Sequence, residues 1–378
     1  MIMETLHGEK VVLRPLRPDD ADDLAAGCDD PLTQRFLPLL PGPYTREHAL
    51  WWITEGAPAA VEAGGWAYGF ADPTTDRLTG GGGGKRLGNG VAEIGYWVAP
   101  WARERGVATE ACRLLAAHVL SQPGNERLVL GTQVENAASQ RVALATGFTR
   151  EGIERAGGGR RDGSRYDRIV WSRLRTDSGE PTPRVLPDLP SGELTDGVVT
   201  LRPLLAADTE DTFALRALPD VLATSVPPVP KEFDTVAEIC ARAQSAWLAG
   251  QRADFTIRDA ATGTYAGEIG LYYWESGTQQ AMTGYSLMPQ WRGRGYTTRA
   301  VRLVATWAFS IGIIRLIAGT APDNVNSHRV LQRAGFEREG YHRARLPGPN
   351  GTRIDDIQWV LLPDMERPAD KDGGPDRS

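Results

Sequence analysis

Apolar and polar positions along the 378-residue chain follow one succession of periods and then repeat it. In each half, short apolar runs between turn residues predict strands, and longer segments with an apolar residue at every third or fourth position predict helices. The expected strands are 10–13, 66–71, 78–87, 92–98 and 127–134, then 198–201, 255–258, 265–273, 283–287 and 313–320. The expected helices are 45–55, 108–120 and 139–146, then 235–248, 298–310 and 327–334. Because several strands run together before helices alternate with them, each half is predicted to be a mixed α/β (α+β) unit and not a doubly wound one.

The repeat extends to individual residues. Gly295 follows Gly106 by 189 positions, and Asn324 follows Asn136 by 188. A match held in register on glycines and an asparagine indicates a duplicated domain. The predicted organisation is a first domain at 1–175, a linker rich in Pro, Gly, Ser and Asp at 176–196, a second domain at 197–363 and a polar, disordered tail at 364–378.

Composition limits the classes of partner. The chain has 42 Lys and Arg against 48 Asp and Glu, a formal charge of −6, so nothing general favours a nucleic-acid partner. Three scattered cysteines predict a reduced, cytoplasmic protein without a metal site. The most apolar segment, 303–319, is interrupted by Gly312 and Arg315, so no membrane span is expected.

The turn before the first long helix has the features of a phosphate site. Residues 103–108 read Arg-Glu-Arg-Gly-Val-Ala, and successive backbone N–H groups at such a helix start converge beside the positive end of the helix dipole. Gly106 removes a Cβ where a phosphate would approach, and 292–297 repeats the turn with Thr297 in place of Ala108. The alternative is a basic helix start that binds nothing. A P-loop and a dinucleotide fingerprint are both excluded by their glycine spacing.

The R-x-x-G-x-A turn, the N-x-x-S segment some thirty residues later and the G-F-x-x-E-G segment after it resemble the GNAT superfamily of acyl-CoA N-acyltransferases. The branch most similar is that of the ribosomal-protein alanine N-acetyltransferases. The resemblance covers nearly the whole of both copies. It implies two tandem GNAT-like domains, each with a mostly antiparallel sheet flanked by helices and splayed between its fourth and fifth strands. It also implies acetyl-CoA as acyl donor, with the pantetheine arm in the splay, and no metal.

The same resemblance assigns residues. The coenzyme-binding residues it implies are Val98, Arg103, Glu104, Arg105, Gly106, Val107, Ala108 and Asn136, then Leu287, Arg292, Gly293, Arg294, Gly295, Tyr296, Thr297 and Asn324. Many family members have a tyrosine seven residues after the asparagine that acts as the general acid, where this chain has Ala143 and Leu331. The acid role therefore falls on Ser139 and Ser327, unless each serine simply caps its helix.

Glu93 is the candidate base. Period-two alternation places it on one face of its strand with Gly95 and Trp97, and the alternative is an ordinary surface glutamate. The second copy has Met282 in that register, and Glu268 on the preceding strand substitutes only if its side chain faces the cleft.

Four further patterns carry predictions of their own. Asp167 and Asp355 in the last hairpins are read as turn or strand-pairing residues. The glycine run 80–84 is interpreted as a loosened sheet edge, with close approach of backbone or ligand as the alternative. Trp51 and Trp52 are candidates to line an acceptor pocket. Thr235 and Glu238 have the spacing of a capping box.

The resulting hypothesis is an N-acyltransferase that moves an acetyl group from acetyl-CoA to a primary amine by direct attack. The first copy is the better candidate for catalysis, because it combines the complete turn with Glu93 and Ser139. The alternative is a non-catalytic acyl-CoA-binding or scaffolding protein with one or both copies degenerate. The expected acceptor is a small-molecule or peptide amine, recognised by loops 38–44 and 227–233. The chain is expected to be a monomer with an internal pseudo-dimer, or a homodimer.

Overall fold

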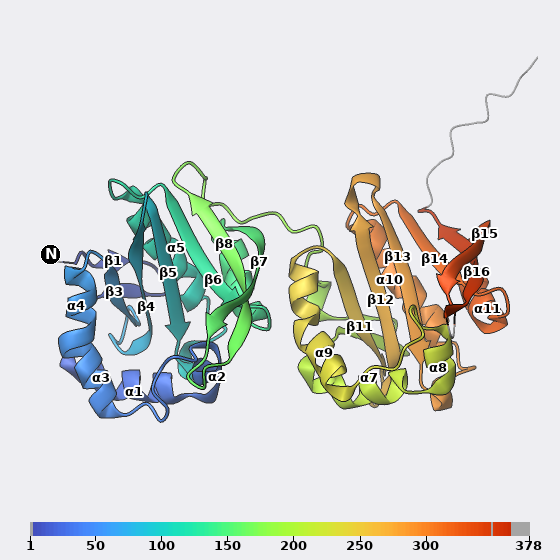
Figure 1. Ribbon diagram of the computed structural model, residues 1–378, viewed down its shortest axis with the longest axis horizontal. Coiled ribbons are helices and arrows are strands. Elements are labelled where there is room, and N and C mark those ends of the chain that lie inside the picture. Colours follow the sequence, from blue (N-terminus) through green and yellow to red (C-terminus); the bar gives the residue numbers. More distant parts are fainter. Residues whose placement is uncertain (1–2, 349–350, 364–378) are drawn as a thin grey trace, which may run out of the picture. The chain divides into compact units, whose positions relative to one another are not determined.

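The chain divides into two compact units between Pro183 and Arg184, and Figure 1 shows the elements of each. This computed structural model describes residues 3–348 and 351–363. The boundary lies inside the segment predicted as a linker, and the end of that segment, β9 (Leu194–Thr195), pairs with the second sheet. The predicted tail, 364–378, lies outside the described residues.

The first unit is an eight-stranded sheet flanked by helices. Its strands are β1 (Leu6–His7), β2 (Val12–Arg14), β3 (Trp66–Ala71), β4 (Leu78–Gly88), β5 (Val91–Val98), β6 (Arg127–Gln133), β7 (Thr149–Gly159) and β8 (Arg165–Leu174). Its helices are α1 (Ala21–Asp29), α2 (Pro31–Phe36), α3 (Arg46–Trp51), the π-helical turn η2 (Trp52–Gly56), α4 (Ala57–Glu62), α5 (Val107–Ser121) and α6 (Ala137–Ala145), with short 3₁₀ turns η1 (Pro18–Asp20) and η3 (Pro100–Ala102). The strand order is β1-β2-β3-β4-β5-β6-β8-β7.

The second unit repeats this architecture. Its strands after β9 are β10 (Val199–Pro203), β11 (Arg252–Asp259), β12 (Tyr265–Glu275), β13 (Gln280–Leu287), β14 (Arg315–Thr320), β15 (Glu337–Pro347) and β16 (Arg353–Leu361). Its helices are α7 (Thr209–Arg216), α8 (Pro219–Thr224), α9 (Phe233–Leu248), α10 (Tyr296–Ser310) and α11 (Val325–Arg333), with short 3₁₀ turns η4 (Pro190–Gly192), η5 (Ala206–Asp208), η6 (Ser276–Thr278) and η7 (Pro289–Trp291). The sheet order is β15-β16-β14-β13-β12-β11-β10-β9. The prediction of two similar domains with mostly antiparallel sheets and flanking helices is confirmed.

Each sheet has one parallel strand pair, and there it opens. β5 pairs with β6 only from Val91 to Ile94, after which the two strands diverge. The rest of β6 pairs with β8 on its other side. In the second unit, β13 pairs with β14 only from Gln280 to Met282. The backbone N–H and C=O groups along these diverging edges therefore lack a neighbouring strand, which is the geometry that admits an extended ligand between two strands.

The two faces of each sheet have different roles. α5 packs on β4, β5 and β6, and its Ala111 and Leu115 are fully buried. α10 packs on the second sheet in the same way, where the rings of Trp247, Phe255 and Trp307 meet at centroid distances of 5.1 to 5.8 Å. The opposite face of the first sheet is covered by α1 near the Trp97 ring. Among the described residues, no helix combines the length and apolarity needed to cross a bilayer.

Two local predictions are wrong. β4, which contains the glycine run 80–84, is a central strand between β3 and β5 and not a loosened edge. A Cβ at Gly82 would lie 2.6 Å from the Phe70 ring, and one at Gly81 would lie 2.9 Å from the Trp97 indole nitrogen, so the glycines allow close approach. The capping box is also absent at Thr235, because α9 begins two residues earlier and Glu232 is its N-cap residue.

Candidate active site

The two predicted phosphate turns have the same backbone shape. Gly106 and Gly295, with φ of 80° and 81°, are the N-cap residues of α5 and α10. Two residues earlier, Glu104 and Gly293 also have positive φ, 62° and 75°. No described heavy atom lies within 4 Å of a Cβ built on Gly295, whereas at Gly106 the Lys10 ammonium lies 2.9 Å away. The second turn therefore leaves room for a phosphate group at a helix N-terminus, and at the first the space holds the end of a flexible lysine side chain.

The first arginine of each turn donates hydrogen bonds within its own domain. Arg103 Nε donates to the Val98 carbonyl at 3.3 Å, and its Nη2 contacts Asp30 and donates to Thr33 Oγ1 at 3.0 Å. Arg292 Nε donates to the Leu287 carbonyl at 2.9 Å in the same way. Partial burial raises the pKa of the Asp30 carboxyl, but Arg103 and the Thr33 amide outweigh it and the net pKa is lowered. These guanidinium groups fix the turn to the end of the preceding strand.

The asparagine of each N-x-x-S segment is a helix cap. Asn136 Oδ1 accepts from the Ser139 amide at 3.1 Å, and Asn324 Oδ1 accepts from the Ser327 amide at 3.2 Å. Each asparagine is the N-cap residue of α6 or α11, and each serine stands at the third helical position. The interpretation of the serines as caps is therefore wrong, and the Ser139 hydroxyl has another neighbour.

That neighbour is Tyr96, which the sequence analysis did not single out. Its hydroxyl lies 3.1 Å from Ser139 Oγ and 3.3 Å from the Ser139 carbonyl oxygen, so it joins the diverging end of β5 to α6. Burial raises the pKa of Tyr96 well above its ordinary value of 10, which keeps the hydroxyl protonated. In the second unit the Tyr285 hydroxyl donates to the Ser327 carbonyl at 3.5 Å. The signal in the sequence was the Gly-Tyr pair that occurs in both copies.

Glu93 lies where β5 begins to leave β6. It is opposite Val129 in the ladder, one residue before the last pair, and its side chain is 24% exposed. Its Oε1 accepts from Arg168 at 3.0 Å, and its Oε2 lies 3.4 Å from the Lys85 ammonium. Beside it, no described atom lies within 4 Å of a Cβ built on Gly95. Glu93 is thus a half-buried, ion-paired carboxylate next to open space.

The second unit differs at the same position. Met282 pairs with Ile317 where β13 leaves β14. Glu268 is held by Arg216 through both carboxylate oxygens, at 2.9 to 3.2 Å, so it is committed to α7. Asp167 and Asp355 each accept a backbone N–H within their last hairpins, from Ala156 and Ala344.

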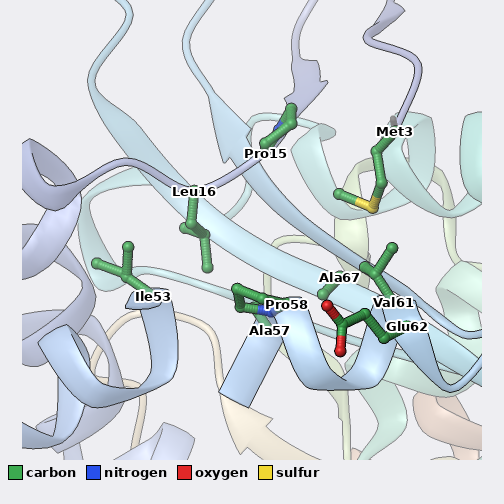
Figure 2. A pocket seen from close by; sticks show the side chains of 9 residues that line it. All are labelled: Met3, Pro15, Leu16, Ile53, Ala57, Pro58, Val61, Glu62 and Ala67. Atoms are coloured by element: carbon green, nitrogen blue, oxygen red, sulfur yellow. The ribbon is translucent and has the colours of Figure 1, made fainter. Parts of the chain in front are cut away.

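One pocket of about 250 Å³ lies under η2 and α4, as Figure 2 shows. Its lining comes from the N-terminal segment, the loop after β2, η2, α4 and β3, and the residues are Met3, Pro15, Leu16, Ile53, Ala57, Pro58, Val61, Glu62 and Ala67. None of these elements borders the opening between β5 and β6. Trp52 packs partly buried near this helix, while Trp51 is 61% exposed.

Comparison with known proteins finds the same family in both halves. The model of the acetyltransferase (GNAT) domain matches residues 10–149 and 199–337. The relative "Probable N-acetyltransferase YjcK" of Bacillus subtilis (strain 168) is 37% identical over 116 residues, which are 30% of this chain and 64% of the relative. The "Ribosomal-protein-serine acetyltransferase" of Escherichia coli (strain K12) is 36% identical over 64 residues, 17% of this chain and 36% of the relative. The chain thus spans about a third to two thirds of the length of these two relatives.

Among solved structures, the ribosomal-protein-S5-alanine acetyltransferase of Vibrio fischeri is similar to this chain at 21% identity. That match covers 47% of this chain and 99% of the other, with a TM-score of 0.42. A RimL in complex with coenzyme A is 18% identical, and the match covers 46% of this chain and 98% of the other, with a TM-score of 0.42.

Proposed function

The chain belongs to the GNAT acetyltransferase family, and from this premise we propose that it transfers an acetyl group from acetyl-CoA to a primary amine, with the first domain equipped for catalysis. The observation that carries the proposal is the position of Glu93. This carboxylate stands at the opening between β5 and β6, beside the space over Gly95. The phosphate turn at Gly106 follows the end of the same strand.

Donor binding is assigned to the backbone of the turn and to the opening. The N–H groups after Gly106 face a pyrophosphate, with Arg105 and Lys10 as nearby cations. The diverging edges of β5 and β6 and the amide of Asn136 take the pantetheine arm. The second domain offers the same elements at Gly295 and Asn324, so two donor sites are proposed.

The chemistry is direct attack. The neutral amine nitrogen forms a bond to the thioester carbonyl carbon, the C–S bond breaks, and the products are an amide and a free thiol. Glu93 accepts the proton that the nitrogen loses, directly or through one water. The Tyr96 and Ser139 hydroxyls, 3.1 Å apart, are placed to supply a proton to the departing sulfur. Holding the two reactants in one cleft contributes the rest.

The acceptor is assigned only as a small-molecule or peptide amine. Loop 38–44 is the proposed recognition surface, since Leu39 within it is 72% exposed. Arg161 at the tip of the β7–β8 hairpin donates to Gln34 Oε1 at 2.9 Å, which fixes this hairpin against α2. Enzymes with this fold use many different acceptors, so the fold alone does not identify the acceptor.

A non-catalytic acyl-CoA-binding protein is the second candidate. The observation in its favour is that both oxygens of Glu93 already lie next to cations, Arg168 and Lys85. A base must exchange part of that ion pairing for the amine proton, whereas a binding protein has no such requirement.

The phosphate turns at residues 103–108 and 292–297 are called the first and the second cradle. The test isolates the first domain by reversing the charge at one position of the second cradle with Arg294→Glu. Thiol release from acetyl-CoA is measured with spermidine and with a peptide that begins with serine. Glu93→Gln is expected to lower kcat about 100-fold or more. Glu154→Gln, in the same Arg168 network but on β7, is the matched control and is expected to retain most of the rate.

Calorimetry with CoA separates the two candidates. Arg105→Glu is expected to remove one of two CoA sites and Arg294→Glu the other. Tight CoA binding without turnover of either amine by the unsubstituted chain would exclude the enzyme and leave the binding protein. Two undisturbed sites in either variant would exclude the assignment of the cradles.

A further inference from the structure

The second domain has a carboxylate, that of Asp356, near its opening. Aligning the two copies at Glu93 and Met282 does not reveal it, because Asp356 lies on another strand. Asp356 on β16 follows Arg168 by 188 positions, as Gly319 on β14 follows Gly131. In the first domain Arg168 crosses Gly131, with its Cδ 2.6 Å from a Cβ built there, and reaches Glu93. In the second domain the carboxylate of Asp356 takes the position of the Arg168 side chain.

Asp356 faces the same side of the sheet as Met282. Its neighbour Ile357 is buried in the core under α10, and so is Ala281 next to Met282, so Asp356 and Met282 both point to the opposite face. Asp356 Oδ1 lies 2.8 Å from a Cβ built on Gly319. Gly319 follows Ile317, the last residue of β14 that pairs with β13. The carboxylate therefore borders the point where the two strands part.

The two oxygens of Asp356 are in different situations. Oδ2 accepts from Arg345 Nη1 at 3.1 Å and lies 3.5 Å from His342 Nδ1. Oδ1 is buried and has no hydrogen-bond partner among the described residues, and the whole side chain is 2% exposed. A buried carboxylate oxygen without a donor is costly, because it has lost water and gained nothing in exchange. A ligand that presents an N–H group at this point would remove that cost.

We propose that Asp356 is the proton acceptor of the second domain, and that this domain also acetylates a primary amine. The inference rests on the proposed function. The acceptor amine donates to Asp356 Oδ1 while Arg345 holds Oδ2. As the new N–C bond forms and the C–S bond breaks, the nitrogen loses its proton to Oδ1. The carboxyl then returns the proton to solvent, and the thiolate takes one up.

The assignment also agrees with the contacts of Glu268 on β12 and with the apolar side chain of Met282 on β13. Glu268 is bound at both oxygens by Arg216 and has no free acceptor to offer. Met282 leaves an apolar wall on the opposite side of the opening from Asp356, where the first domain places its base. The two domains thus approach the amine from different strands, which predicts different acceptor preferences.

The experiment uses the full chain with the first cradle disabled by Arg105→Glu, so that thiol release reports the second domain. With spermidine or the serine peptide, Asp356→Asn is expected to lower kcat about 100-fold or more and to leave CoA affinity unchanged by calorimetry. Asp355→Asn is the matched control on the same strand and is expected to change kcat less than about twofold. Asp356→Glu, which keeps the carboxylate, is expected to recover part of the rate, and melting temperatures verify that each variant folds.

Three results would overturn the assignment. One is an Arg105→Glu chain that binds CoA at its second site but turns over neither amine. Another is equal kcat for Asp356→Asn and Asp355→Asn. The third is a change confined to KM, which would make Asp356 a binding group only. The Arg294→Glu chain reports the first domain separately, so these outcomes leave the proposed function standing, whereas a complete absence of turnover in both chains removes both.

Discussion

The two domains place opposite charges at equivalent points of the same opening. In the first, Arg168 on β8 donates to Glu93 on β5, and in the second the positions of that arginine and that glutamate hold Asp356 on β16 and Met282 on β13. The glycine between them, Gly131 or Gly319, is common to both. Side chains on one face of a sheet can therefore approach each other across a glycine of the strand that lies between theirs. The place of a carboxylate on the sheet is therefore a better guide to its role than its register in a repeat.

A second ion pair also differs between the domains, before the first helix of each. Asp20 is paired with Arg14 of β2 through two hydrogen bonds of 2.8 and 2.9 Å. Asp208, its counterpart, is paired with Arg258 of β11, the next strand in the sheet. In both domains this aspartate also accepts a backbone N–H three residues earlier, at 2.8 Å. The carboxylate is retained in each copy, and its cationic partner comes from a different strand.

The largest expected difference in stability concerns these two pairs. The Arg14 and Asp20 side chains are 5% and 7% exposed, whereas Arg258 is 21% exposed. Asp20→Ala leaves a buried guanidinium without its main partner, which costs about 3–5 kcal/mol in comparable pairs. Asp208→Ala is expected to cost less, since water reaches Arg258. Urea unfolding of each variant provides the comparison, and equal losses would contradict the role of burial.

A smaller and equal effect is expected where the domains agree. Trp171 Nε1 donates to Thr132 Oγ1 at 3.0 Å, and Trp359 Nε1 donates to Thr320 Oγ1 at 2.9 Å, all within the two cores. Thr→Val at either position leaves a buried indole N–H without an acceptor, at about 1–3 kcal/mol. Thr→Ser keeps the hydroxyl and is the control. Unfolding free energies that differ strongly between the two Thr→Val variants would show that the cores are not equivalent.

The repeat and the family motifs were enough to predict two domains, a splayed sheet and the glycine turns at which α5 and α10 begin. The sequence did not reveal which side chains meet across the opening. Arg168 lies 75 residues along the chain from Glu93, and Tyr96 lies 43 residues from Ser139, so no short motif contains either pair. The glycine run at 80–84 was misread for a related reason, because the aromatic rings that fill the space over it come from neighbouring strands. Local patterns report local structure, and these contacts are not local.

A difference of about 1 kcal/mol in the free energy of unfolding is expected from the two cradles, where one has a glutamate and the other a glycine at positive φ. Glu104 has φ 62°, a left-handed conformation that costs a residue with a Cβ about 1 kcal/mol, while the second domain has Gly293 at φ 75°. Gly293→Glu is expected to destabilise the second domain by about that amount. Glu104→Gly is expected to change the first domain little or to stabilise it slightly, since relief of strain offsets glycine's greater chain entropy. Thermal unfolding of both variants tests the pair, and a stabilised Gly293→Glu would contradict it.

The smallest expected effect is on CoA affinity and comes from a lysine that only the first cradle has beside it. The Lys10 ammonium lies beside Gly106, whereas Val198 follows Lys10 by 188 positions and offers no charge to the second cradle. Because Lys10 is exposed, its attraction for a phosphate is of the order of 0.2–1 kcal/mol, so Lys10→Ala is expected to weaken CoA binding by the first domain up to about fivefold. The difference should shrink at high salt, where exposed charges are screened. Calorimetry in the Arg294→Glu chain at low and high salt measures it, with Val198→Ala in the Arg105→Glu chain as the neutral counterpart. A loss that does not depend on salt would mean that Lys10 acts through packing against α5 and not through its charge.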